Sequence, residues 1–265
     1  MSDQAIIDYI LHLGDNALIL GHRNSEWTGH GPILEQDIAL SNIALDLIGQ
    51  ARYYYQYASH RINEDEQAPR PVPGHERIPV TEDVLAYFRD AWDFRNCLLV
   101  EQGNGHWGKT VLRQFFFSAY QFELYGVLRH SRDSQLAAIA EKSLKEVTYH
   151  LRWSGEWVIR LGDGTEESHT RMEEAMTDLW KFTGEFFLPA DYEKTLTLPG
   201  IAVDLATIRP AWDHKVGEVL KTAGLEKKEG ERMQKGGKQG KHTESLGYLL
   251  AEMQFLQRAY PGCEW

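Results

Sequence analysis

Cysteine, basic residues and long apolar runs are all in short supply in this sequence of 265 residues. Its two cysteines, Cys97 and Cys263, form no C-x-x-C pair, which excludes a disulfide framework and a cysteine-based zinc site and fits the reducing cytoplasm. Acidic residues outnumber basic ones 39 to 28, so the net charge is −11 and no nucleic-acid partner is expected. No apolar run reaches the ~20 residues of a membrane span, and we expect neither anchoring nor targeting.

The sequence also lacks the short motifs that reveal common active sites. It has no G-x-S-x-G nucleophile elbow, no P-loop, no G-x-G-x-x-G and no H-E-x-x-H. Sustained alternation of Val, Ile and Thr is missing, so a β-sheet is not expected. A repeat of fixed period, which a solenoid would require, is missing as well.

Apolar residues at helical spacing are present almost throughout the sequence. We predict Thr81 as the N-cap of a third helical run and a capping box at residues 170–173 near the start of the sixth. Together the runs predict one all-α domain over residues 1–265, a four-helix bundle with additional helices. Its expected connections are an exposed proline-rich segment at about 62–80 and a Gly/Lys-rich loop at about 230–242. The expected helical runs cover residues 6–20, 33–60, 81–101, a stretch through about 129, 136–161, 170–186, 205–223 and 245–260.

Helical bundles of this kind often hold a di-iron site, built from one Glu on each of two helices and Glu-x-x-His on the other two. The sequence offers Glu146 and His150, which are four residues apart where the motif requires three. Val147 stands where the carboxylate should be. The sequence therefore predicts no self-contained active site.

The most unusual local feature is a glycine-rich basic loop, Gly236-Gly237-Lys238-Gln239-Gly240-Lys241-His242. Backbone amides and lysines that precede a helix can bind a phosphate group. The alternative interpretation is a surface loop without a ligand.

Several longer motifs are shared with a known family. With them the sequence resembles, over essentially its whole length, the PaaC family, the non-catalytic ferritin-like subunits of the bacterial 1,2-phenylacetyl-CoA epoxidase. The motifs are Leu13-Gly14-Asp15-Asn16, Asp46-Leu47-Ile48-Gly49-Gln50-Ala51-Arg52, Leu99-Val100-Glu101-Gln102, Lys145-Glu146 to Tyr149-His150-Leu151-Arg152, Gly200-Ile201-Ala202-Val203-Asp204, His242-Thr243-Glu244 and Leu250-Ala251-Glu252-Met253-Gln254 to Leu256-Gln257-Arg258.

The resemblance implies a ferritin-like scaffold subunit that is not an enzyme by itself. It would dock on a PaaA-like di-iron catalytic subunit and stabilise it, within a complex that includes other subunits and an NADPH-dependent reductase. Iron would be held by the partner, and no cofactor by this chain. Phenylacetyl-CoA would lie at the shared interface, with Lys238, Lys241 and His242 as candidates for contact with the coenzyme A phosphates.

A comparison with the PaaA family, which the chain resembles more distantly, identifies degenerate ligand positions. Asp46-Leu47-Ile48-Gly49-Gln50 stands in place of Asp-Glu-x-Gly-His, and Lys145-Glu146-Val147-Thr148-Tyr149-His150 in place of Lys-Glu-Glu-x-x-His. The replacements predict a former metal site that is filled by apolar side chains. The former ligand positions are Ala17, Leu47, Gln50, Val147 and His150.

Four expectations about side chains accompany this interpretation. His150 is expected to hydrogen-bond to Gln50 or Asp46. Glu146 and Asp46 are expected to pair with Arg152 or Arg52. Glu123 is the candidate from the third bundle helix. Tyrosines 53, 54, 55 and 57 surround a whole helical turn and predict that a partner covers a second face.

Two alternatives from other functional classes stay open at this point. One is an iron-dependent oxygenase or ferroxidase with an irregular ligand set of His150, Glu123, Glu146 and Asp46. The other is a stand-alone acyl-CoA-binding protein.

Overall fold

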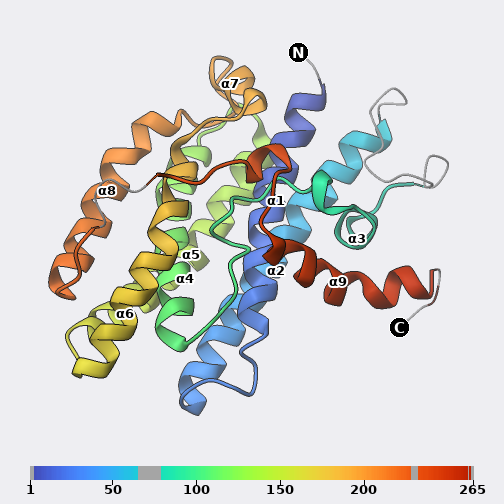
Figure 1. Ribbon diagram of the computed structural model, residues 1–265. Helices are drawn as coiled ribbons and strands as arrows, with labels where there is room; N and C mark the ends of the chain where they lie inside the picture. The colour runs from blue at the N-terminus through green and yellow to red at the C-terminus, as the bar shows by residue number, and fades with distance from the viewer. Residues whose placement is uncertain (1–2, 65–78, 228–231, 262, 264–265) are drawn as a thin grey trace.

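Four long helices form the centre of the protein in the computed structural model (Figure 1). The structure describes residues 3–64, 79–227, 232–261 and 263. Short connections join the first helix to the second and the third to the fourth, so each pair is antiparallel. No β-strand occurs within this part of the chain, and the prediction of an all-α bundle with additional helices is confirmed. The four helices are α1 (Asp3–Ser25), α2 (Leu34–Glu64), α4 (Trp107–Leu128) and α5 (Ser134–Gly162).

Small residues allow α1 to pack closely on α2. Gly14, Ala17 and Gly21 lie on one side of α1, because residues three or four apart share a helix face. A Cβ atom at Gly21 would lie 3.2 Å from the Cβ atom of Leu47, and one at Gly14 would lie 2.7 Å from the Tyr55 ring. Ala17 lies between the two glycines and is fully buried. This seam leaves little room for a longer side chain.

Shorter helices cover one side of the bundle (Figure 1). Helices α6 and α8 pack on α4 and α5, α7 packs on α1, and α3 packs on α2 with α9 beside it. None of the described helices combines the length and the apolar composition that a membrane crossing requires. The shorter elements are α3 (Glu82–Tyr87), the 3-10 helix η1 (Ala91–Asp93), α6 (Glu166–Leu179), η2 (Trp180–Phe187), α7 (Asp191–Thr197), α8 (Leu205–Thr222), η3 (Gly237–Gln239) and α9 (Glu244–Ala259).

The prediction of one helix over residues 81–101 is wrong. Thr81 does cap α3, since its hydroxyl accepts the amide of Val84, but α3 ends at Tyr87. Residues 94–101 form a buried segment without helical structure. Three backbone amides of this segment donate to side chains of α1 and η2, which replace the helical hydrogen bonds. The pairs are Arg95 with Asp15 (2.7 Å), Cys97 with Asn16 (2.8 Å) and Leu98 with Glu185 (2.7 Å).

The predicted start of the sixth helical run is also wrong. Helix α6 begins at Glu166, and its capping box pairs Thr165 with Ser168, so residues 170–173 lie inside the helix. The apolar side of α6 faces the interior, where Met172, Met176 and Leu179 are buried. Helix α7 has no counterpart among the predicted runs.

The predicted proline-rich connection at about 62–80 falls largely on residues 65–78, which lie outside the described residues. Its two ends are joined by hydrogen bonds between Asn63 and Val80. The side chain of Asn63 donates to the carbonyl oxygen of Val80 at 2.8 Å and accepts its amide at 3.0 Å. The end of α2 is therefore held next to the segment that leads into α3.

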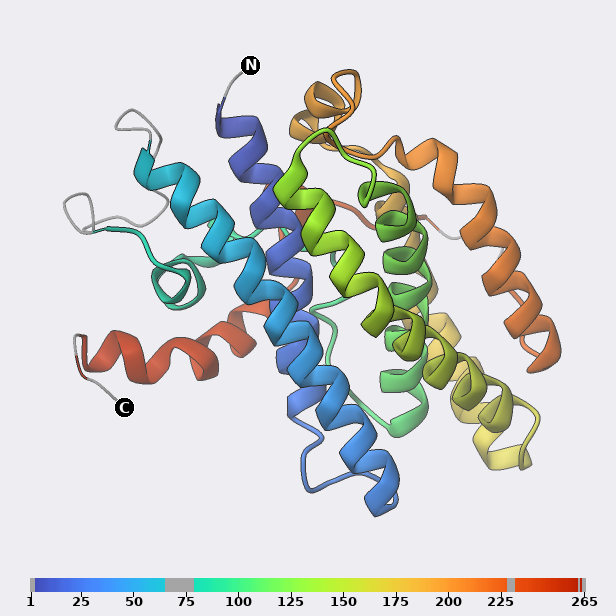
Figure 2. The same ribbon diagram turned by 180° about the vertical axis from the view of Figure 1, so that it is seen from behind.

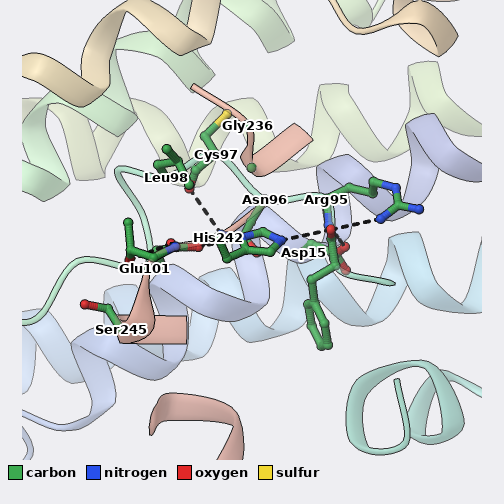
Figure 3. Close-up of polar contacts among 12 residues, drawn as sticks. Asp15, Arg95, Asn96, Cys97, Leu98, Glu101, Gly236, His242 and Ser245 are labelled. Atoms are coloured by element: carbon green, nitrogen blue, oxygen red, sulfur yellow. Dashed lines mark hydrogen bonds and ion pairs between the residues drawn. The ribbon is translucent and has the colours of Figure 1, made fainter. Parts of the chain in front are cut away.

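A buried carboxylate on α1, that of Asp15, ties the first two helices to the segment that follows α3. Figure 3 shows Asp15 beside Arg95 of that segment. Asp15 forms an ion pair with the guanidinium of Arg89, and both side chains are fully buried. The same carboxylate accepts the Tyr55 hydroxyl at 2.6 Å and the backbone amide of Arg95 at 2.7 Å. Its oxygens are thus satisfied by partners from three parts of the chain.

The tyrosine cluster of α2 is covered only in part by the chain itself, so the partner contact inferred from this cluster stays a prediction. Tyr54 and Tyr55 are buried, and the Tyr57 hydroxyl donates to Asp133 at 2.6 Å. Tyr53 is partly exposed and contacts Lys142.

Replacing Asp15 by alanine should lower the free energy of unfolding by about 3–5 kcal/mol, because the substitution leaves the Arg89 guanidinium buried without its counter-ion. Urea unfolding measures this change. Glu167→Ala is the matched control, since it removes the exposed ion pair with Arg171 on α6 and should cost less than ~1 kcal/mol. Similar losses in both variants would contradict a stabilising role for the buried pair.

Candidate functional site

All five predicted former ligand positions lie in the interior of the bundle. Ala17 on α1, Leu47 and Gln50 on α2, and Val147 and His150 on α5 are each at most 1% exposed. Three of these five side chains are apolar and cannot bind a metal ion. The expected apolar filling is therefore present at Ala17, Leu47 and Val147.

His150 hydrogen-bonds to Asp46, one of its two predicted partners. The distance from His150 Nε2 to Asp46 Oδ2 is 2.9 Å, and this contact joins α5 to α2. The other ring nitrogen, Nδ1, is buried and has no hydrogen-bond partner among the described residues. Since an Nε2–H donates to the carboxylate in the neutral ring, Nδ1 is then an acceptor without a donor. The imidazole is held by protein contacts.

Gln50, the other predicted partner of His150, belongs to a separate hydrogen-bond network. Its amide donates to Glu146 at 2.9 Å, and its Oε1 lies 3.4 Å from Gln121 Nε2 and 3.5 Å from the Tyr125 hydroxyl. Burial raises the pKa of Glu146, and the hydrogen bond from Gln50 opposes that rise. Gln50 thus presents a neutral amide at the position where the resemblance to the PaaA family places a histidine ligand.

Gln121 and Tyr125 are residues of this site that sequence analysis did not identify. They lie four residues apart on α4, and Gln121 Nε2 is 3.2 Å from the Tyr125 hydroxyl. The sequence feature that could have identified this site is a glutamine within a strongly apolar helix. Glu123, the residue that sequence analysis proposed from this helix, is partly exposed. Burial raises the pKa of Glu123, and the nearby Lys215 of α8 lowers it.

The predicted arginine partners of Asp46 and Glu146 are wrong. Arg52 lies 3.4 Å from Glu82 at the start of α3, and Arg152 stacks on the ring of Tyr149. Both arginines are exposed. Their helix positions direct them away from the interior, so they do not reach the two carboxylates.

The residues at this site do not fit a di-iron centre. Two ferrous ions carry four positive charges and need carboxylates that balance them. Within residues 3–64, 79–227 and 232–261, no three His, Cys, Asp or Glu side chains come together as a group that could hold a metal ion. The irregular set of His150, Glu123, Glu146 and Asp46 is therefore not assembled.

The glycine-rich loop, of which residues 232–242 are described, packs into the protein. A Cβ atom at Gly237 would lie 2.2 Å from the carbonyl oxygen of Asn96, and one at Gly240 would lie 2.3 Å from that of Trp92. The amides of Gly236 and Gly237 donate to Glu185 Oε1 at 2.7 and 2.8 Å. The glycines are thus explained by close approach to residues 92–98, and their amides bind a carboxylate of the same chain.

Lys238 and His242, predicted to contact phosphate, bind carboxylates of the same chain as well. Lys238 is buried, and its Nζ lies 3.0 Å from Glu193 Oε2. His242 Nδ1 lies 2.7 Å from Glu101 Oε2, and its Nε2 lies 3.0 Å from the carbonyl oxygen of Phe94. Figure 3 shows His242 and Glu101 beside the segment of residues 95–98. Of the three predicted residues, only Lys241 is exposed.

Val147→Glu should destabilise the protein by at least ~3 kcal/mol, because it places an unpaired carboxylate in a packed apolar site. Chemical denaturation measures the loss. Val127→Glu on α4 is the matched control, since Val127 is 44% exposed, and its effect should stay below ~1 kcal/mol. Equal effects of the two substitutions would show that the former site is not closely packed.

The buried His12 should make the protein less stable in mild acid. Its Nδ1 lies 2.7 Å from the carbonyl oxygen of Arg95, and burial lowers its pKa from 6.5 to about 4. As the pH falls from about 6.5 toward 4, the unfolded chain binds a proton at this residue before the folded chain does, so stability is lost. His12→Gln removes this titration and should reduce the difference in unfolding free energy between pH ~7 and ~5.

The matched control for this comparison is His214→Gln, because His214 is exposed on α8. It should keep the wild-type difference between the two pH values. An unchanged difference in His12→Gln would mean that His12 does not set the acid sensitivity.

Comparison with known proteins agrees with the family inferred from the motifs. Residues 1–265 match the model of the family described as phenylacetic acid catabolic protein. The C subunit of 1,2-phenylacetyl-CoA epoxidase from Escherichia coli (strain K12) is 46% identical over 257 residues, which cover 97% of this chain and 98% of that protein. The chain therefore belongs to the phenylacetic acid catabolic protein family.

Proposed function

We propose that the chain is the C-type subunit of a 1,2-phenylacetyl-CoA epoxidase in phenylacetate catabolism, and that it has a structural, non-catalytic role. The identity of 46% with a relative named as the C subunit of this enzyme, over nearly the full length of both chains, supports the assignment. The partners are then the other subunits of the enzyme. A PaaA-like subunit holds the iron, and a reductase supplies electrons from NADPH.

One observation carries the non-catalytic role. The former ligand positions Ala17, Leu47 and Val147 are apolar and buried, and Gln50 holds a neutral amide in their midst. Oxygen chemistry at a di-iron centre requires the carboxylate and imidazole ligands that these positions no longer supply. The chain contributes a folded bundle, and the chemistry belongs to the partner.

The non-catalytic role also implies where the substrate binds and in which compartment the complex works. Phenylacetyl-CoA binds to the catalytic subunit, at or near its contact with this chain. Within the glycine-rich loop, Lys241 is a charged residue that an external phosphate can reach, since Lys238 is buried. The two cysteines, Cys97 and Cys263, are free thiols, which suits the cytoplasm.

Co-expression with a PaaA-type catalytic subunit of the same organism tests the proposal. The tagged chain should co-purify with that subunit at a fixed ratio and should increase its soluble yield. Metal analysis after dialysis should find about two irons per catalytic subunit in the complex and substoichiometric iron in the isolated chain.

Two results would overturn different parts of this proposal. Iron retained by the isolated chain at about two per molecule would contradict the non-catalytic role. Failure to co-purify, with both proteins folded, would contradict the assignment as a subunit.

A further inference from the structure

One face of the bundle is left open by the shorter helices. Figure 2 shows α2 and α5 in front, side by side and antiparallel, with no other described element across them. Hydrogen bonds from His150 to Asp46 and from Gln50 to Glu146 join the two helices over one turn near the middle of each. The outer sides of both helices face solvent.

Helix α2 carries a stripe of exposed apolar side chains on its outer side, which at Ile48 borders a hollow against α3. At 100° per residue, positions 34, 38, 45 and 48 fall within about 80° of arc. A surface helix normally turns polar residues outward, so a stripe of this kind indicates a contact that the isolated chain does not make. The stripe comprises Leu34, Ile38, Leu45 and Ile48, which are 72%, 51%, 66% and 38% exposed.

Helix α5 carries a row of positive charge on its own outer side. Four exposed basic residues fall within about 80° of its outer arc, which also holds the acidic residue Glu156. Three of the cations stack on aromatic rings. Lys142 Nζ lies 4.1 Å from the ring centre of Tyr53, Arg152 Cζ 5.8 Å from that of Tyr149 and Arg160 Cζ 5.5 Å from that of Trp157. In a chain with a net charge of −11, this local excess is unusual. The basic residues are Lys142, Lys145, Arg152 and Arg160.

The surface is also hollowed at one end. A groove of about 480 Å³ runs between the end of α2 and the start of α5, and Tyr53, Tyr57 and Gln135 are among the residues that line it. Tyrosines at the edge of an apolar stripe are typical of protein interfaces, because the ring packs while the hydroxyl stays hydrogen-bonded.

We infer that this α2–α5 face, formed by the apolar stripe of α2 and the basic row of α5, is the docking surface for the catalytic subunit. The inference rests on the function proposed above. The matching surface of the partner presents apolar side chains flanked by Asp and Glu residues, which the basic row of α5 attracts.

Charge decides between this partner and a second copy of the chain. In a symmetric dimer each α2–α5 face would meet the same face of its partner, so both basic rows would lie in one interface that has no matching acidic row. Like charges across an interface are unfavourable. On a different subunit, a surface of apolar side chains flanked by acidic residues can pack on the apolar stripe and pair with the basic row.

The test measures binding of purified variants to the PaaA-type catalytic subunit, for example by biolayer interferometry. The double variant Leu45→Glu/Ile48→Glu should weaken binding at least about 30-fold, since it puts two carboxylates into the apolar centre of the contact. Leu198→Glu is the matched control, because Leu198 is 95% exposed between α7 and α8, and it should bind as the wild type does.

A second variant tests the basic row independently of the stripe. Lys145→Glu/Arg152→Glu should weaken binding at ~50 mM salt and should lower the dependence of the dissociation constant on salt. Both residues are exposed, so this variant keeps the test available if the apolar double variant fails to fold. Circular dichroism and thermal unfolding establish that each variant is folded.

The possible outcomes separate this inference from the function on which it rests. If the wild-type chain does not bind the catalytic subunit, the proposed function fails. If the wild type binds and neither the stripe nor the row variant changes affinity, the α2–α5 face is not the docking surface. Loss of binding in Tyr248→Glu/Phe255→Glu, with the α2–α5 variants unaffected, would move the contact to the exposed aromatic residues of α9.

Discussion

Buried carboxylates that bind backbone amides are the interactions on which this structure most depends. The segment of residues 94–101 crosses the interior without forming a helix, so its amides need partners from elsewhere, and Asp15 and Glu185 supply them. Glu101, at the end of the same segment, accepts hydrogen bonds from Asn96, His242 and Thr243. Without these acceptors the amides would remain unsatisfied in the core. The polar interior joins chain regions that the bundle helices alone would not hold.

Several residues of this polar interior lie in the motifs that the chain shares with the family. Asp15 belongs to the motif on the first helix, Glu101 to the motif that follows residue 98, and His242 to the motif before the last helix. In a catalytic relative such polar residues invite a chemical interpretation. Here they have hydrogen-bond partners within the chain, and their role is to fix the path of the backbone.

The predicted former metal site is filled in a way that keeps the interior of the bundle packed. Leu47 and Val147 fill space with apolar groups, and the neutral amides of Gln50 and Gln121 lie within hydrogen-bond distance of each other without adding a buried charge. Leu47 faces the interior of the bundle and is buried, whereas Leu45 and Ile48 lie on the outer side of α2 and are exposed. The same helix therefore contributes both an apolar filling to the former site and an apolar surface outside the bundle.

The sequence by itself determined the long helices of the bundle, the all-α class and the family, and it predicted the former ligand positions. These rest on local spacing and contiguous motifs, which need no knowledge of distant contacts. Tertiary structure decided the path of residues 94–101 and the meaning of the glycine-rich loop. Glycine and lysine in a loop fit phosphate binding and close packing equally well, and contacts with Glu185 and Glu193, more than 40 residues away, decided between them. Likewise, Gln50 bonds to Glu146 and not to His150 because helix register, which sequence spacing does not fix, sets which side chains face each other across α2 and α5.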